Sequence, residues 1–135
     1  MIEQDTPKQC EFEDESMFFG MCAEILSEGE LVAGKKYEVR VRIVGADRLK
    51  NEDRIGRFVQ FMVRARGSLA LTDGEWIAHK IVPLDKESPE LIFDVIASSA
   101  GWGAVEIDPV FENEWQGMVS LRAYVLAESL DQLSL

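Results

Sequence analysis

Residues 36–43 read KYEVRVRI and decide the fold class. Apolar and charged residues alternate along this stretch, so Tyr37, Val39, Val41 and Ile43 lie on one side and charged side chains lie on the other. Strict alternation is typical of a β-strand with one buried and one solvated face, because successive side chains of a strand point to opposite faces of its sheet. The stretch therefore predicts a strand of an antiparallel sheet.

Further segments with this pattern follow at intervals of roughly ten residues, as in sandwich proteins. They are residues 57–71, which would form a long, bent strand, and residues 76–82, 91–97, 104–108 and 119–125. Glycine, proline and asparagine lie between these segments, and Asp73-Gly74 predicts a hairpin turn. About seven short strands without a long amphipathic helix predict an all-β protein, an antiparallel β-sandwich.

The turn that leads into residues 36–43 adds a resemblance. Ala33-Gly34-Lys35-Lys36-Tyr37 followed by an alternating strand resembles the start of the second strand in bacterial immunoglobulin-like modules. The resemblance implies an immunoglobulin-like sandwich. The chain has no Cys…Trp…Cys framework, which argues against an antibody-type domain.

Composition divides the chain into three parts. Residues 1–16 carry six acidic residues, one lysine and few apolar residues, and we expect a disordered acidic tail there, either solubilising or a docking peptide. Residues 17–127 form the sandwich domain. Within it, residues 17–26 are almost continuously apolar, which leaves helix or strand open and favours strand. Residues 128–135 form a C-terminal tail.

The charge and the cysteine content limit the kinds of partner and the cellular compartment that we expect for this chain. The net charge is −11, yet residues 35–66 carry ten bases and four acids. The acidic total argues against nucleic acid and membrane surfaces as partners, although a local basic patch is compatible with it. Cys10 and Cys22 match no metal-ligand spacing, and no signal segment opens the chain, so we expect free thiols and a cytoplasmic protein. A disulfide that holds the N-terminal tail in place is the alternative.

Catalytic motifs are missing from the sequence. There is no nucleophile elbow, phosphate-binding loop, zinc-protease motif or EF-hand loop, and the single histidine, His79, lies in a predicted strand as a structural or surface residue. Carboxylate pairs such as Glu106 with Asp108 are more often solvated faces than metal or glycosidase sites. We therefore expect neither an enzyme nor a metal or other cofactor.

The candidate site residues lie on the outer faces of the predicted strands. Four arginines would form one basic ridge if their strands are neighbours, or they would pair with this chain's own acids. Three apolar or aromatic residues share such faces, where they would form an interface or be covered by residues 126–135. Two tryptophans lie near predicted turns, where they could stack on a ligand or close the core. These residues are Arg40, Arg42, Arg64, Arg66, Phe58, Met62, Tyr124, Trp102 and Trp115.

The sequence therefore predicts a non-catalytic interaction or accessory module. It would dock on a partner protein, or self-associate, through a basic and apolar strand face. A carbohydrate-binding module that uses Trp102 and Trp115 is the alternative, and a small enzyme built on carboxylates and His79 is the second alternative.

Overall fold

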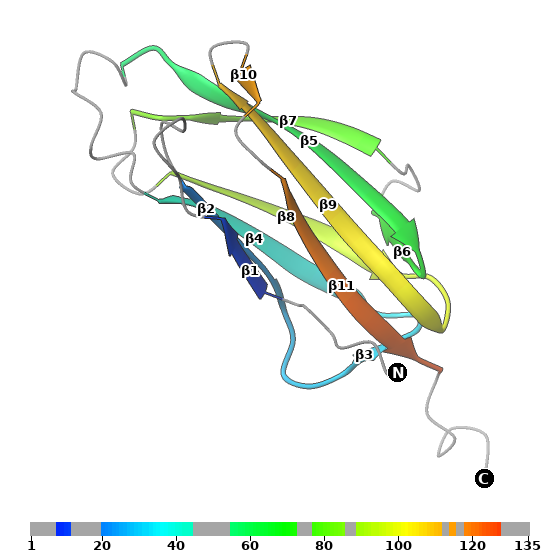
Figure 1. The fold of residues 1–135 in the computed structure, drawn as a ribbon. Helices are drawn as coiled ribbons and strands as arrows, with labels where there is room; N and C mark the ends of the chain where they lie inside the picture. The colour runs from blue at the N-terminus through cyan, green and yellow to red at the C-terminus, as the bar shows by residue number, and fades with distance from the viewer. Residues whose placement is uncertain are drawn as a thin grey trace, which may run out of the picture.

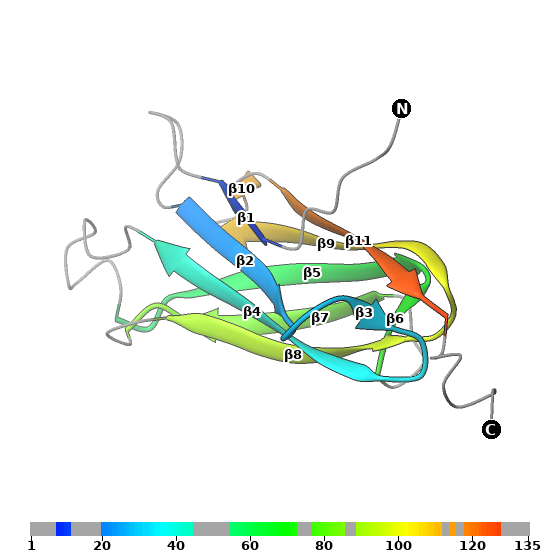
Figure 2. The ribbon, with the colours of Figure 1, turned by 90° about the horizontal axis from the view of Figure 1, so that it is seen from below.

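The computed structural model describes residues 8–11, 20–44, 55–72, 77–85, 89–111, 114–115 and 118–127. Every regular element in these residues is a strand, and the strands form two packed sheets (Figures 1 and 2). The predicted all-β sandwich is confirmed. The strands are β1 (Lys8–Glu11), β2 (Gly20–Leu26), β3 (Leu31–Val32), β4 (Lys36–Val44), β5 (Phe58–Gly67), β6 (Leu69–Leu71), β7 (Ile77–Pro83), β8 (Glu90–Ala97), β9 (Gly101–Phe111), β10 (Glu114–Trp115) and β11 (Val119–Leu126).

The described strands number eleven, where the sequence predicts about seven. The five-stranded sheet has the order β1-β2-β4-β8-β6. The six-stranded sheet has the order β3-β11-β9-β5-β7, with β10 beside β9 and β3 parallel to β11. The partial orders β2-β4-β8-β6 and β11-β9-β5 are those of the two sheets of an immunoglobulin-like sandwich.

The core lies between the two sheets and is made of the inward-pointing residues of each strand. On β4, Val39, Val41 and Ile43 are buried, and the corresponding set on β5 includes Phe61 and Val63. Full burial of such a side chain stabilises the fold by roughly 1.5–3 kcal/mol. The alternation that predicts the strands thus also identifies the core.

The N-terminal segment departs from its prediction. Lys8–Glu11 form β1, which pairs antiparallel with β2, so this part of the predicted acidic tail is a strand. The Gln9 side chain also accepts a hydrogen bond from the backbone N–H of Ser120 on β11, at 2.9 Å. The rest of residues 1–16, and residues 128–135, lie outside the described residues.

The free thiol predicted at Cys22 is also wrong, because Cys22 is disulfide-bonded. The chain contains one other cysteine, Cys10, whose backbone lies directly opposite Cys22 in the β1–β2 pair. Two cysteines twelve positions apart become neighbours only because β1 folds back along β2. The reading of residues 17–26 as strand is confirmed for Gly20–Leu26, and residues 17–19 lie outside the described residues.

Gly67 marks the point where the chain crosses between the sheets. The sequence predicts one long, bent strand over residues 57–71, followed by a hairpin at Asp73-Gly74. In the structure β5 ends at Gly67, β6 pairs with β8 in the five-stranded sheet, and β7 pairs with β5 in the six-stranded sheet. Because β6 and β7 belong to different sheets, they do not form the predicted hairpin; the turn itself lies outside the described residues.

Candidate functional site

The predicted ridge of four arginines does not form. Arg40 and Arg42 lie on β4 in the five-stranded sheet, and Arg64 and Arg66 lie on β5 in the six-stranded sheet. Each pair points away from the core that the two sheets share, because the residues between them point inward and are buried. The four arginines therefore occupy the two opposite outer faces of the sandwich as two separate pairs.

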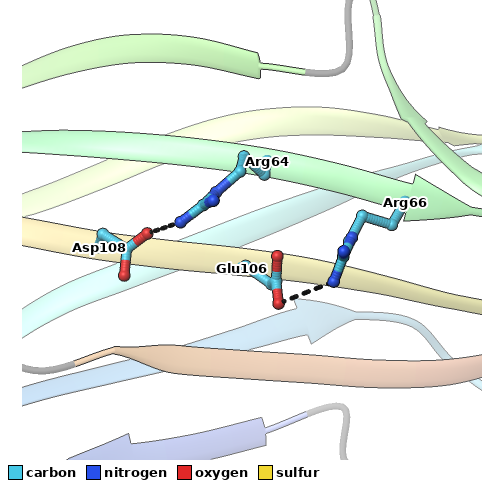
Figure 3. A network of polar contacts seen from close by, with 4 residues as sticks. All are labelled: Arg64, Arg66, Glu106 and Asp108. Carbon is cyan, nitrogen blue, oxygen red and sulfur yellow. Dashed lines mark hydrogen bonds and ion pairs between the residues drawn. The ribbon is translucent and has the colours of Figure 1, made fainter.

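Arg64 and Arg66 pair with acidic residues of the neighbouring strand β9, which is one of the two arrangements that the sequence predicts for them (Figure 3). Arg64 donates a hydrogen bond to Asp108, and Arg66 contacts Glu106 with 3.3 Å between Nη1 and Oε2. The hydrogen bond and the charge of Asp108 raise the pKa of the Arg64 guanidinium above its ordinary value. Arg64 is therefore a fixed cation whose main partner is internal.

On the opposite face, Arg40 lies 3.9 Å from a carboxylate oxygen of Glu38 and 3.9 Å from one of Glu90. Its side chain and those of both partners are exposed. Exposed pairs at this separation contribute little to stability, about 0–1 kcal/mol. Arg42 is exposed and lies opposite Glu90 in the β4–β8 register.

Trp102 lies within β9, although the sequence predicts a turn at this position. Its side chain lies on the outer face of the six-stranded sheet, where the ring meets Tyr124 of β11 edge to face, with 5.3 Å between ring centroids. The Arg122 guanidinium carbon lies 5.2 Å from the centre of the Trp102 ring, which is a cation–π contact. Arg122 was not among the predicted site residues.

A shallow groove lies beside Trp102. Its volume is 220 Å³, and it is lined by Arg66, Gly67, Trp102, Gly103, Ala104 and Arg122. Arg66 on β5 and Arg122 on β11 both lie opposite Ala104 on β9, so the small alanine separates two long cationic side chains. The groove thus brings together Arg66, which was predicted as part of a basic ridge, and Trp102, which was predicted to stack on a ligand or close the core. Tyr124 packs against Trp102.

The backbone beneath the groove is tightly packed. Gly67 has a φ of +64°, and a Cβ added there would lie 2.4 Å from the carbonyl oxygen of Trp102. That same oxygen accepts a hydrogen bond from the backbone N–H of Ser68, at 3.1 Å. The glycine therefore allows β5 to approach β9 closely at this point, and the approach fixes the backbone that carries Trp102.

Exposed apolar side chains concentrate on this same outer face. Seven large hydrophobic residues are exposed in the described part of the chain; four of them point outward from strands of the six-stranded sheet, and a fifth, Met118, directly precedes β11 of that sheet. We call these five the apolar set: Phe58, Ile81, Met118, Tyr124 and Leu126. Met62, half-buried, lies on the same face of β5. Phe58, Met62 and Tyr124 thus point away from the core, as predicted from alternation, and the sheet order places them on one face.

The remaining predicted residues are not brought into a common site. His79 is exposed on β7, opposite Met62. The backbone of Trp115 lies in β10, opposite Val110, and its side chain lies outside the described residues. Within the described ranges, no three histidine, cysteine, aspartate or glutamate side chains converge as a metal site. Nor does that part of the chain include a helix with the length and apolar character to cross a bilayer.

Comparison with known proteins does not assign the chain to a family. No protein-family model matches the sequence, and no curated protein is significantly similar to it. Among solved structures, the chain is similar to the solution NMR structure of residues 27–141 of a conjugate transposon protein from Bacteroides vulgatus. The identity is 14% and the TM-score 0.44, over 92% of this chain and 89% of that chain.

Proposed function

We propose that this chain is a non-catalytic interaction module that docks on a partner protein through the outer face of its six-stranded sheet. The observation that carries the proposal is the apolar set, because five of the seven exposed large hydrophobic residues in the described part of the chain lie on this face or directly beside it. Isolated exposed apolar residues are ordinary, whereas this set extends along one face, from Phe58 and Ile81 near one end of the sheet to Tyr124 and Leu126 near the other, as a docking surface of standard size would require.

The structure alters the chemistry expected of this face. Arg64 and Arg66 have carboxylate partners on β9, so the face is less basic than the sequence alone predicts. Contact with a partner would then depend mainly on the apolar set. Buried aromatic and aliphatic side chains at the centre of an interface usually contribute most of the binding free energy.

Two isoleucines provide a matched test. Ile81 is 60% exposed on the outer face of the six-stranded sheet, and Ile92 is 45% exposed on the outer face of the five-stranded sheet. We expect Ile81→Glu to weaken partner binding at least about tenfold, because a desolvated carboxylate at an apolar contact costs more than about 1.4 kcal/mol. Ile92→Glu should leave binding unchanged.

The measurement is affinity purification of the tagged full chain and both variants from the native host, followed by quantitative mass spectrometry. Light scattering on the purified chain measures its molar mass in solution and so detects self-association, in which the partner is a second copy of the chain. Loss of the same partner from both variants, or from Ile92→Glu alone, would contradict docking through the six-stranded sheet.

The carbohydrate-binding alternative is less well supported. Sugar-binding sites use an exposed aromatic face as a platform, but the Trp102 ring carries the Arg122 guanidinium. The groove beside it presents two guanidinium groups, which suit a planar anion better than a neutral sugar.

The Cys22 disulfide bears on the compartment. Disulfides persist in oxidising compartments and are rare in the cytosol, so this bond favours an oxidising compartment over the cytoplasm predicted from the sequence. Alkylation of the chain in freshly lysed host cells tests the point. We expect Cys22 to remain unmodified, and an alkylated Cys22 would support the cytoplasmic prediction instead.

A further inference from the structure

We propose that the groove beside Trp102 binds a carboxylate, carried by an aspartate or glutamate side chain in an extended acidic segment of the partner protein. Arg66 and Arg122 would hold this carboxylate between them above Ala104. The inference rests on the proposed function and specifies the partner chemistry that the six-stranded sheet would recognise.

The strand register places the two arginines for this role. Arg66, Ala104 and Arg122 lie side by side on three successive strands, β5, β9 and β11. Because neighbouring strands are about 4.8 Å apart, the two arginine Cα atoms are separated by roughly 10 Å. The alanine methyl group leaves the space above β9 open, and a carboxylate can accept paired N–H bonds from a guanidinium at about 2.7–2.9 Å.

The charge of this face also favours an anionic ligand. The whole chain carries −11, but the described residues of this outer face include three arginines and only two carboxylates. The Arg66 side chain is 67% exposed and has one contact with Glu106, at 3.3 Å, whereas a guanidinium has five N–H donors. Charges elsewhere on the chain are screened over about 8 Å at physiological ionic strength.

The groove is built before any ligand arrives. Arg122 stacks on Trp102, Tyr124 packs against the same ring, and the Gly67 contact fixes the backbone beneath. A guanidinium held against an aromatic ring loses less conformational freedom when it binds a carboxylate. The stacking thus prepares one of the two arginines for recognition.

Binding of short peptides to the full chain tests the inference. The probe is a blocked, fluorescently labelled peptide of alternating glutamate and glycine, and its matched control has glutamine in place of glutamate. We expect the glutamate peptide to bind at least about tenfold more tightly than the glutamine peptide by fluorescence anisotropy. Higher salt should reduce the difference, because it screens the ionic contact.

Four variants locate the binding site. Arg66→Gln and Arg122→Gln should each remove the preference for glutamate. Arg42→Gln and Ile92→Glu, both exposed on the opposite outer face, should retain it. Arg66 is exposed, so Arg66→Gln should keep the thermal midpoint of unfolding of the wild type. If Arg122→Gln disturbs the packing of Trp102, Arg66→Gln still tests the site.

The outcomes separate this inference from the proposed function. Equal binding of the two peptides, or a preference that survives both groove variants, would overturn the carboxylate site. Tighter binding of an oligoglucuronate than of the glutamate peptide would overturn the assignment to a protein segment. Docking through the six-stranded sheet would still stand or fall on the comparison of Ile81→Glu with Ile92→Glu.

Discussion

Replacing Phe61 with alanine is expected to lower the free energy of unfolding by about 3–5 kcal/mol. Phe61 is 1% exposed and is among the largest fully buried side chains, at the centre of β5 between the two sheets. Its removal loses the burial of the ring and leaves a cavity that the flanking strands cannot readily fill. Urea denaturation followed by circular dichroism measures the loss.

The control for this substitution lies on the same strand. Phe58 is 45% exposed and points to the outer face, so Phe58→Ala should cost less than about 1 kcal/mol. The two variants remove the same side chain from opposite faces of β5. Equal losses would mean that the alternation along β5 does not separate a buried face from a solvated one.

Replacing Gly67 with alanine should be nearly as damaging, with a loss of at least about 3 kcal/mol. The alanine would have to adopt a left-handed conformation, and its Cβ would lie 2.4 Å from the backbone oxygen of Trp102. Because a backbone oxygen cannot turn away as a flexible side chain can, β5 and β9 would have to separate. The indole resonance of Trp102 in NMR spectra should shift with the loss of stability.

Gly56 is a matched control for Gly67. It also has a positive φ, of +73°, but a Cβ added there meets nothing within 4 Å. Gly56→Ala therefore carries only the conformational strain, roughly 1–2 kcal/mol. If the two alanine variants lost the same stability, the close approach of β5 to the Trp102 backbone would play no part.

Alternation was sufficient to predict the strands that form the core. Residues 36–43 and 119–125 contain an uninterrupted inward set, and the structure places them in β4 and β11. Such a pattern reports which side of a strand is buried, because it depends only on the direction of successive side chains. It therefore also assigned Phe58, Met62 and Tyr124 to solvated faces correctly.

The same pattern does not report which sheet a strand joins. Arg42 and Arg64 alternate with core residues in the same way, yet β4 and β5 lie in different sheets. The predicted ridge required these strands to be neighbours, and neighbourhood is set by long-range pairing that local periodicity does not contain. For the same reason, nothing in the sequence indicated that Arg122 would lie across Ala104 from Arg66.

Proline and composition also misled the prediction at two points. The sequence predicts a short strand over residues 104–108 that ends before Pro109, but β9 continues to Phe111. The Trp102 carbonyl accepts a hydrogen bond from Ser68, so the backbone polar groups of Trp102 face the β5 side of β9. These groups alternate in direction along a strand, so those of position 109 face the β11 side. The pairing of β11 with β9 stops at Ile107. A missing N–H therefore costs little there. At the N-terminus, the acidic composition predicts a disordered tail, but residues Lys8–Glu11 form β1, which pairs with β2.

Side-chain oxidation by hydroxyl radicals tests the proposed docking face most directly. The chain is compared free and in the complex purified from its host, and oxidation is quantified residue by residue. We predict that Phe58, Met118 and Tyr124 become several-fold less reactive in the complex, while Ile92 keeps the reactivity of the free chain. Protection of Ile92, with Phe58, Met118 and Tyr124 as reactive as before, would contradict the assignment of the binding surface to the six-stranded sheet.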